Sequence, residues 1–235
     1  MFSAGDAYER FMGRWSRALA PQLVRLSNVS DGGAVLDVGS GTRARQRHRA
    51  GRIRFAVGNA QHLPFAGDTF DRTLSLLILN FVPDPAKAVT EMSRVTRPGG
   101  TIAAAVWDYG GSMEMLRVFW EEAVDLDAGA ADRDERRMPL CRCGELAALW
   151  RAHQLQDVIE EPLTIRMEFA SFDDYWLPFQ EQQGPAGAYV ATLGQDSRER
   201  LRLRLRSRLV ADGADRPFVL GARAWAVRGR LGARK

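Results

Sequence analysis

Residues 35–65 decide the fold, and their sequence is "VLDVGSGTRARQRHRAGRIRFAVGNAQHLPF". The stretch begins with an apolar run that enters the Gly-rich turn "GSG" (39–41), and it ends with a second apolar run that enters the polar turn "GNAQ" (58–61). In an open α/β sheet, ligands bind beyond the carboxyl ends of the strands. Glycines let the backbone approach a ligand, and the amides of a following helix can bind negative charge. The stretch predicts a cofactor-binding turn, although a plain tight turn has the same pattern.

Further apolar runs along the chain complete a sheet. Four strands are predicted, at residues 34–38, 52–57, 72–79 and 101–107. Continuous apolar runs of this length are typical of a sheet that is covered on both faces. A helix is predicted before the last strand, because Asp84 can cap it, Pro85 suits its first position and "RPGG" (97–100) ends it. Strands that alternate with helices predict a doubly wound α/β sheet.

The second half of the chain has a less regular pattern. Helices are predicted in five segments, at residues 7–26, 112–127, 144–153, 171–182 and 196–209. Extended structure is predicted at residues 157–171 and 222–229. The alternation "RLRLRLR" inside 196–209 would suit a strand equally well. Because no linker or repeat separates these segments, we expect a single domain over residues 1–235.

The composition is that of an ordinary globular protein, with 46% hydrophobic and 26% charged residues. The net charge of +4 is too small to indicate nucleic acid as a partner. The longest apolar run, at residues 74–82, is too short to span a bilayer. The first residues lack the apolar core of a signal peptide, so a cytoplasmic protein is expected. The two cysteines and three histidines are not spaced as a zinc site, and no metal is expected.

Four segments together resemble a known family. In chain order they are "VLDVGSGT" (35–42), "VGNAQHLPF" (57–65), "FDRTLSLLILNFVPDP" (70–85) and "EMSRVTRPGGTIAAAVWD" (91–108). Their order and wording resemble the class I S-adenosylmethionine-dependent methyltransferases, closest to the ubiquinone/menaquinone C-methyltransferase branch with its type 11 domain. The resemblance implies a Rossmann-like, mostly parallel sheet with a C-terminal antiparallel strand. It also implies S-adenosylmethionine as cofactor and methyl transfer to a small-molecule acceptor.

The resemblance also implies which parts of the chain form the core, cover the substrate and contact the cofactor. Residues 34–108 would form the core, and residues 109–235 would complete the sheet and cover the substrate with helices. Cofactor contacts are implied at seven positions: Asp37, Gly39, Gly41, Thr42, Asn59, Ala60 and Leu76. Asp37 would lie near the amino group of the cofactor and the two glycines along its methionine part. Asn59 and Ala60 would meet the adenine, where an Asn oxygen can accept from the amino group.

Methyl transfer depends largely on positioning, sometimes with a base for the accepting atom. Asp108, Tyr109 and His62 are weak candidates for such a base, because they follow a predicted strand or the adenine turn. A wall of aromatic side chains around the substrate is a further hypothesis, with four members: Trp15, Trp120, Tyr175 and Trp176. Aromatic residues at helical spacing are more often part of a core than of a site.

The chain departs from the family after the Gly-rich turn. Only about a dozen residues separate Gly41 from Ile53, where the family has a helix, a strand and a second helix. The acidic residue that holds the ribose is absent, and Arg43 replaces the third glycine of the turn. One strand and its flanking helices of the usual seven-stranded sheet are therefore predicted to be missing. The sheet either closes this gap or keeps an uncovered edge.

Two other functions remain open from the sequence. The first is a non-catalytic remnant of the methyltransferase fold that contacts protein or RNA, which the missing acid and the run "RARQRHRAGR" (43–52) favour. Such a charged run is more often a solvated surface. The second is a nicotinamide-dependent oxidoreductase, since "GSGTRA" (39–44) matches Gly-x-Gly-x-x-Ala. The acid expected about 20 residues later is absent, so this function ranks last.

Overall fold

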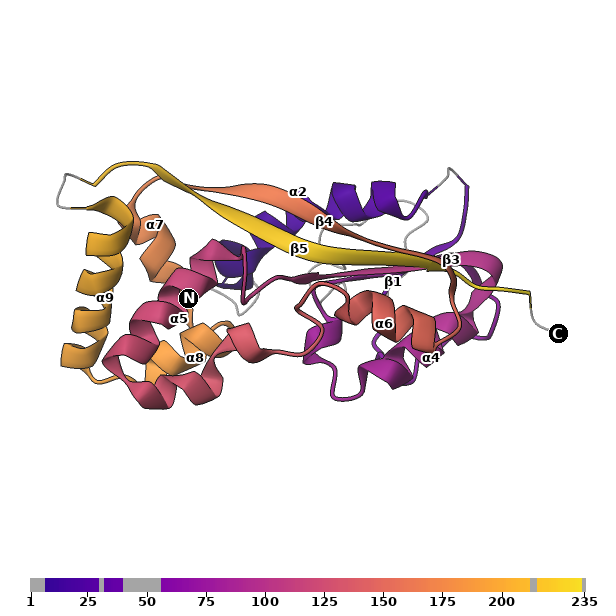
Figure 1. Cartoon of the computed structure of the whole chain (residues 1–235), viewed down its shortest axis with the longest axis horizontal. Coiled ribbons are helices and arrows are strands. Elements are labelled where there is room, and N and C mark those ends of the chain that lie inside the picture. The colour runs from indigo at the N-terminus through magenta and orange to yellow at the C-terminus, as the bar shows by residue number, and fades with distance from the viewer. Residues whose placement is uncertain (1–6, 30–31, 40–55, 212–214, 234–235) are drawn as a thin grey trace. The chain divides into compact units, whose positions relative to one another are not determined.

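The computed structural model divides the chain into two compact units, which are described separately (Figure 1). The described residues are 7–29, 32–39, 56–211 and 215–233. The first unit, called here the helical unit, comprises Met1–Arg17, Asp108–Met138 and Thr164–Arg223. The second, called the sheet unit, comprises Ala18–Trp107, Pro139–Leu163 and Ala224–Lys235. Helix α2 (Arg14–Leu26) and strands β4 (Gln156–Phe169) and β5 (Phe218–Arg230) have residues in both units.

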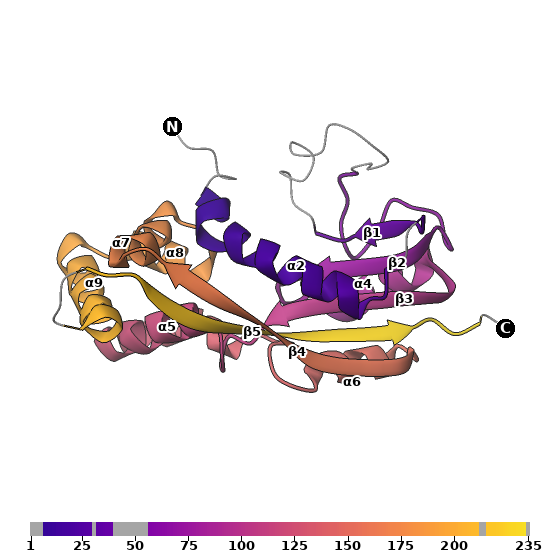
Figure 2. The same cartoon turned by 90° about the horizontal axis from the view of Figure 1, so that it is seen from above.

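A five-stranded sheet has the strand order β1-β2-β3-β5-β4. Strands β1 (Val35–Asp37), β2 (Phe70–Leu76) and β3 (Thr96–Trp107) are parallel neighbours, as Figure 2 shows. Strand β5 runs antiparallel to β3, with Trp107 opposite Ala224 at one end of the pairing and Thr101 opposite Arg230 at the other. The prediction of an α/β, mostly parallel sheet with a C-terminal antiparallel strand is therefore confirmed.

The sheet unit is built around β3, whose residues from 101 to 107 are all buried. The alanines at its centre leave room for side chains on both faces. On one of its neighbours, α6 (Glu145–Ala152), Trp150 donates from Nε1 to the backbone oxygen of Ile102 at 3.0 Å. Helix α4 (Pro85–Val95) begins as the sequence predicts, because Asp84 accepts from the backbone N–H of Lys87 at 2.9 Å. The buried face of α4 holds Ala88, Val89, Met92 and Val95.

Several predicted boundaries differ from the structure, and one predicted strand lies mostly outside the described residues. Strand β3 begins at Thr96 rather than at residue 101, because Thr96 already pairs with Phe70 of β2, before the register shifts between Phe70 and Arg72. Strand β2 ends at Leu76 rather than at residue 79, because the short 3₁₀ helix η2 (Leu79–Phe81) follows it. The strand predicted at residues 52–57 falls mostly outside the described residues, and residues 56–57 are irregular.

The helical unit contains most of the remaining helices of the described chain. They are η1 (Glu9–Gly13), α5 (Glu114–Leu126), η3 (Ala128–Arg133), η4 (Glu135–Arg137), α7 (Phe172–Trp176), η5 (Leu177–Glu181), α8 (Gly184–Thr192) and α9 (Gln195–Val210). The "RLRLRLR" segment is helical, as α9, because Leu201 and Leu205 lie one turn apart and both are buried. The helical period therefore decides its structure.

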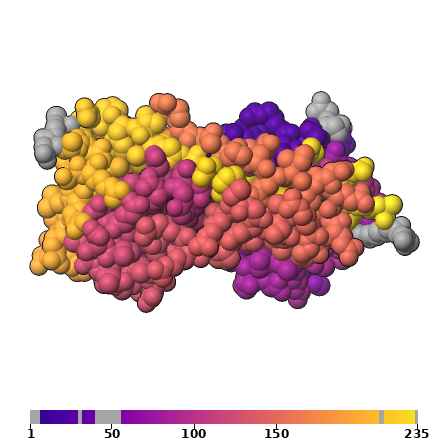
Figure 3. Space-filling model, in the orientation of Figure 1, coloured from indigo at the N-terminus to yellow at the C-terminus, as the bar shows by residue number. Residues whose placement is uncertain are grey.

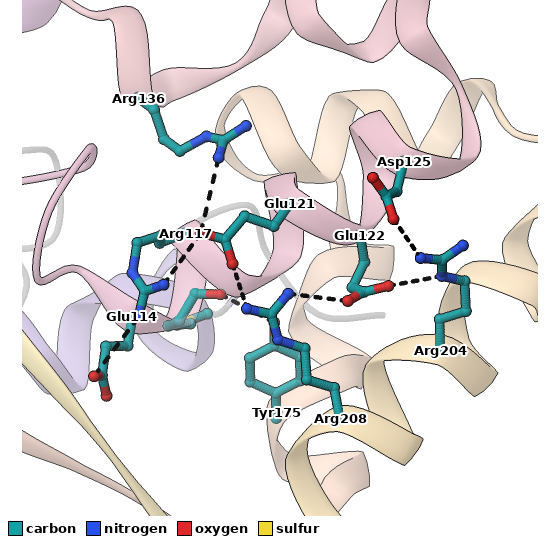
Figure 4. A network of polar contacts seen from close by, with 10 residues as sticks. Glu114, Arg117, Glu121, Glu122, Asp125, Arg136, Tyr175, Arg204 and Arg208 are labelled. Atoms are coloured by element: carbon teal, nitrogen blue, oxygen red, sulfur yellow. Dashed lines mark hydrogen bonds and ion pairs between the residues drawn. The ribbon is translucent and has the colours of Figure 1, made fainter.

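Helices α5 and α9 lie next to one another at the surface of the helical unit (Figure 3). Carboxylates of α5 face arginines of α9 across this contact (Figure 4). Arg204 donates from Nε to Glu122 at 2.7 Å and from Nη2 to Asp125 at 2.7 Å. Arg208 bonds to Glu122 at 2.9 Å and also to Glu121. Partly exposed pairs such as these contribute little singly, and together they fix how α9 lies on α5.

Candidate functional site

The first part of the candidate site lies where β1 and β2 end side by side in the sheet unit. Asp37 is the register partner of Leu74, and the N–H of Val38 donates to the Leu74 oxygen at 2.8 Å. Parallel pairing therefore brings Asp37 and Gly39 to the same sheet edge as Leu76, the last residue of β2. Three of the seven predicted cofactor contacts thus lie at the carboxyl ends of adjacent strands, where open α/β sheets bind ligands.

Two residues at this edge have unusual backbone conformations. Gly39 has a φ of +98°, and a Cβ atom placed on it would lie 2.4 Å from Cγ1 of Ile78. Only glycine fits this position. Leu77, directly after β2, has a φ of 62° and donates its N–H to the Ala105 oxygen at 2.8 Å. A non-glycine residue in the left-handed region costs about 1–3 kcal/mol, and such strain concentrates at ligand sites.

Asp37 supplies the negative charge of this edge. The protein around its carboxyl raises the pKa by desolvation, from 3.8 to about 6, while the residue remains accessible to water. At neutral pH the carboxylate form prevails and can pair with a cation that approaches from solvent. Desolvation strengthens such a pair because the competing water is partly removed.

The second part of the candidate site is the loop of residues 58–65, called here the GNA loop. The N–H of His62 donates to the backbone oxygen of Asn59 at 2.8 Å, which closes a turn. Oδ1 of Asn59 accepts from the N–H of Gln61 at 2.9 Å and keeps one lone pair free for a donor. A Cβ on Gly58 would lie 2.7 Å from the ring of Pro64, so the loop closes on a glycine. Asn59 and His62 are exposed and Ala60 is half-buried.

The other predicted cofactor contacts, Gly41 and Thr42, lie outside the described residues, as does Arg43. The implied roles of all seven positions stay predictions. The part of the chain that the structure describes contains no cluster of three or more side chains suited to hold a metal ion. Cys141 is buried and Cys143 is exposed, and the two do not form a disulfide.

Asp108, one of the predicted base candidates, is buried and engaged in the helical unit. Its Oδ2 accepts from Nε and Nη2 of Arg223 at 2.9 and 2.6 Å, and from the N–H of Ser112 at 3.0 Å. The N–H of Asp108 also donates to the Arg223 oxygen at 2.9 Å. These contacts favour a structural role, in which Asp108 fixes the turn after β3. The neighbouring Tyr109 is only 3% exposed.

The four aromatic residues considered for a substrate wall are all buried in the helical unit: Trp15, Trp120, Tyr175 and Trp176. They belong to its core, and Tyr175 donates to the Met115 oxygen at 3.0 Å. Within this core lies a carboxyl group that the sequence did not reveal. Glu135 is 3% exposed and accepts from Nε1 of Trp120 at 2.9 Å. Burial raises its pKa to about 7.

Part of the chain is similar to known proteins. Residues 12–104 match the family described as a methyltransferase domain. An uncharacterised protein of Mycobacterium tuberculosis is 30% identical in an alignment of 138 positions, which covers 47% of this chain and 50% of that protein. A demethylmenaquinone methyltransferase of Lactiplantibacillus plantarum is 36% identical over 92 residues, 38% of this chain and 39% of that protein. The chain therefore spans about half the length, or less, of these curated relatives.

Solved structures share the fold. A putative methyltransferase from an antibiotic biosynthesis pathway of Anabaena variabilis has a TM-score of 0.60 at 16% identity. The alignment covers 93% of this chain and 97% of that one. Within the described residues, no helix is long and apolar enough to cross a membrane.

Proposed function

We infer that this chain is a class I methyltransferase, which transfers a methyl group from S-adenosylmethionine to a small-molecule acceptor. The observation that carries the proposal is the paired edge of β1 and β2. There Gly39 and Leu77 both have positive φ, and the carboxylate of Asp37 stands beside them. A carboxylate next to a glycine turn at the carboxyl ends of parallel strands suits a cofactor with a cationic amino group.

The described residues fit the two ends of that cofactor. The Asp37 carboxylate is accessible and can accept from an ammonium group. In the GNA loop, the free lone pair of Asn59 Oδ1 can accept from the adenine amino group. Gly39 lets the backbone turn tightly without a side chain between the strand end and the ligand.

When bound, S-adenosylmethionine supplies a methyl group on a positively charged sulfur, which the acceptor attacks in line. The chain then has to hold the two reactants at the correct distance and angle, which alone accounts for a large share of the rate. Asp37 and Asn59 would set the cofactor in place. His62, Asp108 and Tyr109 remain candidates for a base. The hydrogen bonds of Asp108 to Arg223 favour a structural role for it. A cytoplasmic location and the small-molecule nature of the acceptor also remain predictions.

Calorimetric titration of the folded protein with S-adenosylmethionine and S-adenosylhomocysteine tests the proposal. Micromolar binding, about −8 kcal/mol, is expected. Asp37→Asn should weaken binding about tenfold or more, because it removes a charge-assisted hydrogen bond. Lys87→Gln is the matched control, because Lys87 is exposed on the first turn of α4 and should not affect binding. A folded protein that binds neither compound would instead be a non-catalytic remnant of the family.

A further inference from the structure

Two side chains of α4 hold the GNA loop by hydrogen bonds. Glu91 and Arg94 form an ion pair with two contacts, from Nε to Oε1 at 2.7 Å and from Nη2 to Oε2 at 2.8 Å. Arg94 also donates to the oxygens of Phe65 at 2.8 Å and Leu63 at 2.9 Å. Glu91 Oε2 accepts from the N–H of Leu63 at 2.8 Å. The pair therefore satisfies three backbone groups of one short loop.

The backbone of α4 extends this attachment beyond the loop. The N–H of Asp68 donates to the Arg94 oxygen at 3.1 Å, and the N–H of Thr69 donates to the Val95 oxygen at 2.9 Å. Among the described residues, the hydrogen bonds of positions 58–65 stay within the loop or go to Glu91 and Arg94. The loop is thus held from the side of α4.

We propose that the Glu91–Arg94 pair is the positioning device of the cofactor-binding GNA loop. It sets the place of Asn59, on the adenine side of the site, from α4. This inference rests on the proposed function for its link to the cofactor. It also answers a question raised by the sequence, where about a dozen residues replace a helix, a strand and a helix before this loop.

The chemistry of the pair suits such a role. The planar guanidinium bridges a carboxylate and two carbonyl oxygens at fixed angles, which a lysine ammonium cannot do. The Glu91 side chain is only 12% exposed, and the Arg94 hydrogen bonds hold the pKa of its carboxyl at about 2. The pair stays ionised over the whole working range of pH. Leu63, the residue held by both members, is 7% exposed and anchors the loop through its apolar side chain.

Amide hydrogen exchange in the ligand-free protein tests the proposal directly. In Arg94→Gln, exchange of the Leu63 amide should accelerate about tenfold or more, because the Gln side chain cannot bridge the same groups. The Leu205 amide in α9, in the helical unit, exchanges by openings that leave the pair intact, and its rate should be unchanged. Arg94→Lys should give an intermediate rate, and Glu91→Gln a smaller change than Glu91→Leu, because an amide oxygen can still accept from Leu63. Arg151→Gln, an exposed arginine of α6, is the matched control.

Affinity for S-adenosylhomocysteine is the second readout, and it should fall about tenfold in Arg94→Gln. Unchanged exchange at Leu63 would overturn the proposal. Equal acceleration at Leu63 and Leu205 would also overturn it, because the pair would then affect the whole protein rather than the loop. If the wild-type protein does not bind the compound, the proposed function fails. Selective acceleration at Leu63 would still support the pair as the device that positions the loop.

Discussion

The buried carboxyl of Glu135 makes the stability of this protein depend on pH in a defined direction. Burial raises the pKa of Glu135 from 4.5 to about 7. Between these two values the native state keeps a proton that the unfolded chain has lost. The contribution of this proton to stability is therefore complete below pH 4.5, and it is lost as the pH rises through about 7.

The size of the effect follows from the same two values. At about 1.36 kcal/mol for each pKa unit, the interval from 4.5 to about 7 corresponds to about 3 kcal/mol of unfolding free energy. Glu135→Gln removes the titration and keeps an oxygen that can accept from Nε1 of Trp120, now 2.9 Å away. The substitution should therefore abolish the contribution of Glu135 to the pH dependence without leaving the indole N–H unpaired.

Urea unfolding of the wild type and Glu135→Gln, followed by tryptophan fluorescence at several pH values from 4.5 to 8, measures the effect. The difference between the two free energies of unfolding isolates Glu135, because all other titrating groups contribute to both proteins. The variant should gain about 3 kcal/mol relative to the wild type between the two ends of this range. A difference that stays constant with pH would refute the buried, protonated carboxyl.

Three further substitutions test other parts of the structure. Gly39→Ala should destabilise the protein by about 1–3 kcal/mol, because of the positive φ and the approach of Ile78, and an unchanged melting temperature would disprove that packing. Asp108→Asn should cost about 1.5–3 kcal/mol in urea unfolding by weakening the contacts to Arg223, whereas wild-type stability would argue against its structural role. Arg208→Gln should cost less than about 1 kcal/mol, because its ion pairs are partly exposed, and a larger loss would mean that the α5–α9 network acts cooperatively.

The fold could be predicted because its signals are local. Continuous apolar runs mark β1, β2 and β3, and the pair Asp84–Pro85 marks the start of α4. The helix predicted at residues 196–209 is present as α9, although its alternation suits a strand equally well. Leu201 and Leu205, which are buried one turn apart, distinguish the two.

The candidate site could be predicted in part. The glycine turn and the GNA loop are visible as motifs, since glycine and asparagine have local conformational meaning. The hydrogen bond from Arg94 to Leu63 is not visible as a motif, because it joins the loop to a helix residue 31 positions away in the sequence. The pairing of Asp108 with Arg223 joins residues 115 positions apart, and no local sequence pattern predicts it. A Glu–Arg spacing of three on one helix is the only signal that the sequence offers for the α4 pair.

In the proposed site, the edge of β1 and β2 and the GNA loop together bind S-adenosylmethionine. Ultraviolet cross-linking of methyl-labelled S-adenosylmethionine, followed by mass spectrometry of the labelled peptides, tests it most directly. Label is expected in peptides that contain residues 35–39, 58–65 or 76–78, and S-adenosylhomocysteine should reduce it by competing with the labelled compound. Label confined to other peptides, or label that the competitor does not displace, would contradict it.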